Sequence, residues 1–305
     1  MNEPFRARRR AARASTAKRG DGLDPILREI DGLIGLDPVK DEIFRIVDFA
    51  RIVALKKERD LPVANLTFHM VFTGPPGTGK TTVARYIGRL LYELKLLRKD
   101  KLIEVDRSAM VGTHLGDTAR IVQDKVKDAL DGVLFIDEAY TLAGGGGATG
   151  KTDPFGQEAI DTLLKLMEDH RERLVCIFAG YTTEMRRFVE ANPGLKSRIS
   201  RTIEFPSYDG DELFQIFGNL IEKNGFNLSD EASDEARKVI DSLAREADEN
   251  FGNAREIRRF FEALQPIQAE RLADHLEEIG DLSQMSDEDL MRIEAEDVIR
   301  YAETI

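Results

Sequence analysis

A glycine-rich segment carries the residue types best suited to bind phosphate. Residues 74–81 read Gly-Pro-Pro-Gly-Thr-Gly-Lys-Thr and match the pattern G-x-x-x-x-G-K-[ST]. The apolar run at 66–72 before them predicts a buried strand, and the pattern at 82–91 after them predicts a helix. In a strand–loop–helix arrangement, backbone N–H groups and the helix N-terminus surround phosphates. The segment therefore predicts a nucleotide-binding loop.

Each residue of this loop has an expected role toward ATP and Mg²⁺. Lys80 would reach the β- and γ-phosphates, and the Thr81 hydroxyl would ligate Mg²⁺. The residues that we expect to line the nucleotide here are Pro75, Pro76, Gly77, Thr78, Gly79, Lys80, Thr81 and Thr82.

A second segment fits the same pattern but lacks the flanks. Residues 145–152 include Lys151, yet no strand leads directly into them, and Asp153-Pro154 follows where a helix should continue. Pro154 disfavours helical geometry at Asp153. We interpret this segment as a surface loop that does not bind ATP.

Two carboxylates end an apolar strand pattern. The run Val133–Ile136 is followed by Asp137 and Glu138. At the tip of a strand in the same α/β alternation, Asp137 would complete the Mg²⁺ shell, and Glu138 would activate water for attack on the γ-phosphate. The pair predicts hydrolysis in addition to binding.

Composition indicates a soluble globular protein with a real core. The 305 residues are 42% hydrophobic and 33% charged, and the net charge of −12 does not favour nucleic acid as a partner. Residues 1–20 are basic and predict a disordered tail; an acidic partner, nucleic acid, a membrane surface or an organelle transit signal remain alternatives for it. No run approaches the length of a transmembrane segment, and Cys176 lies in an apolar strand as a core residue. These features, with no secretory signal, fit a cytoplasmic protein.

Strand and helix patterns alternate through the middle of the chain. Strands are predicted at 66–73, 102–105, 133–136, 174–179 and 202–205, with helical patterns between them. This alternation predicts an α/β fold with a parallel sheet sandwiched by helices. After Tyr208 we expect no further strand, only a small all-helical lid domain. The expected organisation is a tail at 1–22, a nucleotide-binding domain at 23–206, a lid at 207–275 and an acidic helical segment at 276–305.

Taken together, these motifs resemble the AAA+ P-loop ATPases, and more narrowly the CbxX/CfxQ family. The loop at 74–81 is similar to the family's Walker A motif, and Asp137-Glu138-Ala139-Tyr140 to the end of its Walker B motif. Further similar segments are residues 156–168 for the following helix, 179–185 for sensor 1, 192–199 for the arginine-finger segment and 253–258 for sensor 2. The resemblance covers roughly residues 33–273.

The resemblance implies roles for residues outside the two motifs. Arg198, with Arg201 as the fallback, would act as an arginine finger on a neighbour's ATP, which implies a homo-oligomeric ring, most often a hexamer. Arg255 would contact the nucleotide of its own subunit, and either Tyr181 or Thr182 would be the sensor-1 residue. His114, Leu115 and Gly116 match the family's pore loop, with His114 standing where tyrosine is usual.

The implied function is ATP-driven remodelling of a protein client. Red-type Rubisco activases, which pull on the Rubisco large subunit, have a similar length and layout. Type VII secretion and sporulation ATPases share the same module and are the alternative. A nucleic-acid motor or loader, or a nucleotide-gated scaffold with little turnover, is less favoured by the motifs and the charge.

The two glycine loops make a direct test. Lys80→Ala should abolish ATP binding because it removes the ammonium that reaches the phosphates, whereas Lys151→Ala should leave the ATP dissociation constant nearly unchanged. Titration with a fluorescent ATP analogue measures both. An equal loss of affinity in the two variants would show that the flanking sequence does not identify the binding loop.

Overall fold

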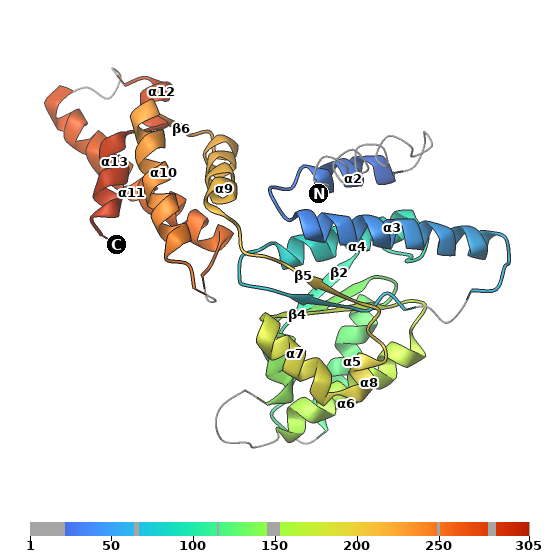
Figure 1. Cartoon of the computed structure of the whole chain (residues 1–305). Helices are drawn as coiled ribbons and strands as arrows, with labels where there is room; N and C mark the ends of the chain where they lie inside the picture. Colours follow the sequence, from blue (N-terminus) through green and yellow to red (C-terminus); the bar gives the residue numbers. More distant parts are fainter. Residues whose placement is uncertain are drawn as a thin grey trace. The chain divides into compact units, whose positions relative to one another are not determined.

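The computed structural model describes residues 22–63, 67–114, 116–144, 153–248, 251–279 and 285–304. It divides into two compact units (Figure 1). The first comprises residues up to Gly74 and Gly79–Phe205, and the second comprises Pro75–Thr78 and everything from Pro206 onward. The expected basic tail, up to residue 21, and the second glycine segment at 145–152 lie outside the described residues.

A five-stranded parallel sheet forms the centre of the first unit. Its order is β2-β3-β4-β1-β5, and all four pairings are parallel. The strands are β1 (Met70–Thr73), β2 (Leu102–Val105), β3 (Val133–Ile136), β4 (Val175–Gly180) and β5 (Arg201–Glu204). Strands β1, β3 and β4 are buried along their whole length, which explains their continuous apolar sequence.

Helices cover both faces of this sheet (Figure 1). On one face lie α2 (Leu23–Asp31), α3 (Asp37–Glu58) and α4 (Lys80–Glu93). On the other lie α5 (Asp117–Ala129), α6 (Pro154–Asp169), α7 (Thr182–Ala191) and α8 (Pro193–Lys196). Two short 3₁₀ helices, η1 (Arg107–Ala109) and η2 (Ala139–Ala143), follow β2 and β3. The predicted α/β class is confirmed.

The predicted strands agree with the structure to within a few residues. β2 and β3 have the expected bounds, and β4 and β5 are each displaced by one residue at their ends. β1 is shorter than the apolar run suggests, because its ladder with β4 begins at Met70 and Ile177. Cys176 is fully buried in β4, and burial raises the pKa of its thiol, so the prediction of a core cysteine is confirmed.

The second unit is built from helices around its own apolar core. Its elements are α9 (Gly210–Lys223), β6 (Asn227–Leu228), α10 (Asp230–Arg245), α11 (Ala254–Ile279), α12 (Asp287–Leu290), β7 (Arg292–Ile293) and α13 (Ala295–Ala302). Phe217 of α9 stacks on Phe260 of α11, with ring centroids 4.9 Å apart. Ile293 and Val298 join the same core, so residues beyond the acidic stretch at 276 pack into this unit.

The expectation that no strand follows Tyr208 is wrong for one short pair. β6 and β7 form a two-residue parallel pairing, Asn227 opposite Arg292 and Leu228 opposite Ile293. Two residues show no sequence periodicity, so the signal that reveals longer strands is missing here. Capping boxes begin α9 at Asp209 and α12 at Ser286, although α12 is a single turn.

A buried histidine precedes the central strand. His69 is fully buried, and its Nδ1 accepts a hydrogen bond from Cys176 N at 3.0 Å. Burial, together with the nearby charge of Arg198, lowers the pKa of His69 to about 4, and these effects outweigh the opposing effects of the Met167 backbone and Glu168. The folded protein therefore holds this imidazole neutral with its proton on Nε2.

This burial predicts a loss of stability in mild acid. Because the ordinary pKa of 6.5 falls to about 4 on folding, the unfolded state takes up the proton first as pH drops below 6.5. The free energy of unfolding should fall progressively between pH 6.5 and 4, by up to about 3 kcal/mol from this group. In His69→Asn, whose amide oxygen replaces Nδ1 as acceptor, chemical denaturation should show a shallower pH dependence. The same slope in both proteins would contradict the assignment.

Candidate nucleotide-binding and hydrolysis site

The phosphate-loop lysine lies at the start of α4, as the sequence predicts. Gly79 precedes the helix with φ of 90°, a left-handed conformation that glycine adopts without strain. Lys80, Thr81 and Thr82 form the first turn. The Lys80 ammonium donates to Gly74 O at 2.8 Å, which holds it over the beginning of the loop. The helix N-terminus and this ammonium together present positive charge to an anion.

Residues Pro75–Thr78, in the middle of the phosphate loop, belong to the second unit. Within that unit Thr78 is buried and its hydroxyl donates to Pro75 O at 2.9 Å. Asn253, fully buried with φ of 49°, donates to Pro76 O at 3.2 Å and accepts from Tyr208 N at 2.9 Å. The sequence analysis placed Asn253 only in the segment similar to sensor 2 and did not predict its contact with Pro76, which stands 177 positions away.

The two carboxylates extend from the end of β3. Asp137 N donates to Val105 O at 2.8 Å, which continues the ladder with β2. Glu138 follows in a left-handed conformation with φ of 47°, and its N–H donates to Asp137 Oδ1 at 3.1 Å. Only β4 separates β3 from β1 in the sheet, so the carboxyl ends of β1 and β3 lie about 10 Å apart. The sheet thus brings Asp137 and Glu138 to the same edge as Lys80.

Oxygen donors at this edge fit Mg²⁺. Thr81 offers a hydroxyl and Asp137 a half-buried carboxylate, the hard ligands that Mg²⁺ takes alongside waters and nucleotide phosphates. Within the described ranges no cluster of three or more His, Cys, Asp or Glu side chains could hold a metal by itself. Mg²⁺ would therefore depend on the nucleotide for further ligands.

Arg107 forms hydrogen bonds that hold the turn after Asp137 and Glu138. Its guanidinium donates to Thr141 O at 2.9 Å and to the Asp153 carboxylate. The Thr141 hydroxyl in turn donates to Glu138 O at 2.6 Å. Asp153 also accepts from Phe155 N and so caps α6. Arg107 was not among the predicted site residues, since nothing in its local sequence distinguishes it from a surface arginine.

Two tyrosines, which follow β3 and β4, lie close to each other. Tyr181 is the N-cap of α7, directly after β4, and Thr182 is the first helical residue. The ring of Tyr140 lies 6.1 Å from that of Tyr181, centroid to centroid. Burial raises the pKa of Tyr140, and the nearby Glu138 side chain raises it further.

The predicted finger arginine lies away from the phosphate loop of its own chain. Thr67 donates to Arg198 O at 3.0 Å, and Ser200 N donates to His69 O at 2.8 Å. These bonds place Arg198 beside the amino end of β1, whereas Lys80 follows its carboxyl end, and an extended segment from 67 to 74 covers about 20 Å. The side chain is 26% exposed; its Nη1 donates to Gly194 O at 2.8 Å, and its Nε lies 3.5 Å from Glu168.

The remaining predicted residues are spread over the chain. Arg201 of β5 lies 3.4 Å from Glu42, and Arg255 is exposed in the first turn of α11 in the second unit. His114 is 83% exposed, and its Nδ1 lies 3.0 Å from the Thr113 hydroxyl and 3.5 Å from Asp117. Leu115 lies outside the described residues. Gly116 precedes α5 with φ of 86°.

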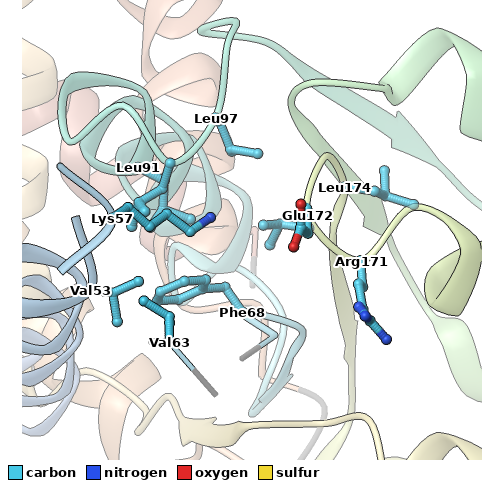
Figure 2. Close-up of a pocket in the computed structure, with 11 residues that line it drawn as sticks. Val53, Lys57, Val63, Phe68, Leu91, Leu97, Arg171, Glu172 and Leu174 are labelled. Carbon is cyan, nitrogen blue, oxygen red and sulfur yellow. The ribbon is translucent and has the colours of Figure 1, made fainter. Parts of the chain in front are cut away.

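A small cavity lies at the amino ends of the strands, whereas the phosphate loop follows the carboxyl end of β1. It has a volume of about 70 Å³ and is lined by Val53, Val63, Phe68, Leu91, Leu174 and neighbours (Figure 2). Phe68 precedes β1 and Leu174 precedes β4, so the cavity belongs to the amino ends of the strands. Ligand pockets usually measure about 300 Å³ or more, so this cavity is too small for a nucleotide.

In the described part of the chain, no helix is long and apolar enough to cross a membrane.

Two family models match the two units. The model described as "ATPase family associated with various cellular activities (AAA)" matches residues 70–207, and the model described as "AAA lid domain" matches residues 209–304.

Several curated proteins are similar over most of this chain. Stage V sporulation protein K of Bacillus subtilis is 39% identical over 289 residues, covering 94% of this chain and 86% of that protein. Protein CbbX of Cereibacter sphaeroides is 41% identical over 254 residues, covering 83% and 80%. The ESX-3 secretion system protein EccA3 of Mycobacterium tuberculosis is 40% identical over 283 residues, 89% of this chain. The chain spans only 44% of the length of that relative.

A solved structure supports the same fold. The AAA domain of FIGL-1 in complex with ADP aligns with a TM-score of 0.59 over 90% of this chain and 83% of that chain. At 16% sequence identity this similarity concerns the fold alone.

The loop geometry predicts opposite effects of one substitution at two glycines. Gly77 has φ of 71°, and a Cβ there would lie 2.0 Å from Gly252 O, so Gly77→Ala should distort the loop and weaken ATP binding about tenfold or more. Gly218→Ala is the matched control, because this helical glycine has nothing within 4 Å of the added Cβ. It should leave ATP binding unchanged and raise the free energy of unfolding by about 0.5–1 kcal/mol. Calorimetric ATP titration and chemical denaturation check both. Unchanged ATP affinity in Gly77→Ala would contradict the constraint.

Proposed function

The chain belongs to the AAA family of ATPases, and we propose that it is a ring-forming protein remodeller of the CbxX/CfxQ type that hydrolyses ATP with Mg²⁺. The observation that carries this proposal is the separation of Arg198 from the phosphate loop within one chain. Arg198 lies beside the amino end of β1, too far away to contact a nucleotide bound to the phosphate loop of its own chain. In a ring it would contact the nucleotide of a neighbouring copy.

The first unit supplies the residues for hydrolysis. Lys80 holds the terminal phosphates, Thr81 and Asp137 ligate Mg²⁺, and Glu138 accepts the proton of the attacking water. The water oxygen bonds to the γ-phosphorus as the bond to the leaving ADP oxygen breaks. The position of the strands supports this assignment. Lys80 and Thr81 follow β1, Asp137 and Glu138 follow β3, and the carboxyl ends of these two strands are separated only by β4. The metal supplies neutralisation of phosphate charge when bound.

Arg198 completes the site of a neighbouring subunit. Its partial exposure supports this role, since a finger must reach beyond its own surface. Glu168 and Gly194 O hold the guanidinium in the single chain, so reaching a neighbour requires exchanging these partners for phosphate oxygens. A closed ring follows from such head-to-tail contacts, and a hexamer is typical of the family. Arg255, Tyr181 and Thr182 are proposed to contact the nucleotide of their own subunit.

The client is proposed to be a protein gripped in the ring's pore. The 83% exposure of His114 supports a substrate-facing loop, with Leu115 and Gly116 beside it. The net charge of −12 does not favour nucleic acid. The Rubisco large subunit is one candidate client, from the resemblance to red-type Rubisco activases. The similarity to a sporulation protein and to an ESX-3 secretion protein supports the alternative, a sporulation- or secretion-associated ATPase.

Mixed rings test the finger and the ring together. Arg198→Ala should leave ATP affinity nearly intact and lower turnover by up to the order of 10³, because the neighbour's transition-state charge loses its arginine. Lys80→Ala subunits lack ATP binding but keep the finger. In mixed rings, each interface that joins an intact loop to an intact finger should recover ATPase activity.

The controls are homogeneous rings of each variant, and co-purification of differently tagged subunits shows that mixing occurred. Absence of recovery in rings proven to be mixed would rule out action of Arg198 on a neighbour.

A further inference from the structure

The tip of the phosphate loop, Pro75–Thr78, touches the turn at residues 251–255 that begins α11, here called the α11 turn. Both segments belong to the second unit. Gly77 has φ of 71°, and a Cβ on it would lie 2.0 Å from Gly252 O and 3.0 Å from Arg255 N. The two backbones therefore leave no room for a side chain between them, and the α11 turn blocks any movement of Gly77 toward it.

Asn253 supplies the side chain of this contact. It is fully buried, and its φ of 49° is a left-handed conformation that asparagine adopts more readily than most residues. Its Nδ2 donates to Pro76 O at 3.2 Å and to Phe251 O at 2.9 Å. Its Oδ1 accepts from Tyr208 N at 2.9 Å. Both donors and the acceptor of the amide are used, which fixes its orientation.

The hydrogen bond to Pro76 O sets the direction of the Gly77 N–H. A trans peptide is planar, so its C=O and N–H point in opposite directions. With Pro76 O turned to Asn253, the N–H of Gly77 points away from the α11 turn. Backbone N–H groups of such glycine loops are the donors that surround phosphate oxygens. The Tyr208 hydroxyl lies 3.5 Å from Thr78 O, a longer contact that favours the same direction for the following N–H.

We propose that Asn253 is a positioning residue for phosphate binding, which holds the peptide between Pro76 and Gly77 so that its N–H faces the phosphates and which makes nucleotide affinity depend on the α11 turn. The inference rests on the proposed role of residues 74–81 as the phosphate-binding loop. A donor that already faces its acceptor costs less to order when the ligand binds, so Asn253 raises affinity without contacting the nucleotide. By reciprocal linkage, a bound nucleotide stabilises the α11 turn.

A role in stability alone makes a different prediction. If Asn253 only stabilises the second unit, its loss should change nucleotide affinity no more than a loss of stability elsewhere in that unit. Ser229 supplies this comparison, because its hydroxyl caps α10 by accepting from Ala232 N at 3.1 Å and its N–H donates to Ile293 O at 3.1 Å. Both partners lie outside the phosphate loop and the α11 turn.

The first experiment compares Asn253→Gly with Ser229→Ala in the full chain by calorimetric titration. Glycine keeps the left-handed backbone and removes the amide, so the Kd for ADP and for ATP should each rise about fivefold, the factor expected for one neutral hydrogen bond. Both should rise equally, because the loop surrounds phosphates that ADP and ATP share. Ser229→Ala should lower the thermal midpoint and leave both Kd values unchanged. Unchanged Kd values in Asn253→Gly, or an equal rise in Ser229→Ala, overturn the proposal.

Amide hydrogen exchange tests the reverse effect, from the nucleotide to the α11 turn. Saturating ADP should slow exchange at residues 251–257 in the unaltered protein and in Ser229→Ala. In Asn253→Gly, with ADP again at saturation, this slowing should be reduced, because the bond that joins the loop to the turn is gone. The same slowing in all three proteins contradicts the proposed dependence.

Asn253→Asp at pH 8 separates the two partners of the side chain and serves as a second variant if glycine prevents folding. It keeps an oxygen for Tyr208 N but, when ionised, has no donor for Pro76 O, so both Kd values should rise at least as much as in Asn253→Gly. Normal ATP binding by Lys80→Ala would remove the proposed phosphate loop and this inference with it. Loss of binding in Lys80→Ala, with normal binding in both Asn253 variants, would remove only the inference.

Discussion

The parallel pairing of β4 with both β1 and β3 is the constraint on which the first unit depends. Met70 pairs with Ile177 on one side of β4, and Ile136 pairs with Phe178 on the other. Because all three strands run in one direction, the segments that follow them emerge at one edge. The phosphate loop, the two carboxylates and Tyr181 are those segments. An antiparallel β4 would have sent Tyr181 to the other edge and separated it from Glu138.

The amino ends of the same parallel strands form the opposite end of the sheet, and the side chains there differ from those at the carboxyl ends. Phe68, His69 and Leu174 lie at the amino ends, where a cavity of about 70 Å³ and a fully buried imidazole are found. Arg198 also lies there, held by the Thr67 hydroxyl and by Glu168. One strand, β1, therefore joins the phosphate loop to the segment that carries the proposed finger. In the proposed ring, this strand would connect one subunit's nucleotide to the site of its neighbour.

Side chains from other elements contact the turn that follows Glu138. Arg107 reaches from the end of β2 to Thr141 and Asp153, and Tyr140 packs on the end of β4. In the second unit Asn253 plays a comparable part by joining Pro76 to Tyr208. Arg107 and Asn253 each form hydrogen bonds with backbone groups that regular secondary structure leaves unpaired. These contacts convert a general fold into a defined arrangement of functional groups.

Local patterns in the sequence determined the element types, the phosphate loop and the acidic strand end. These depend on short-range physics: apolar continuity in buried strands, glycine at positive φ before α4, and capping residues such as Asp209. Contacts between distant residues were decided only by tertiary structure. The β6–β7 pair, the reach of Arg107 and the place of Arg198 beside Thr67 join positions that no local pattern relates. Such contacts arise when packed helices and strands bring side chains together, and a single sequence carries no periodic signal of that packing.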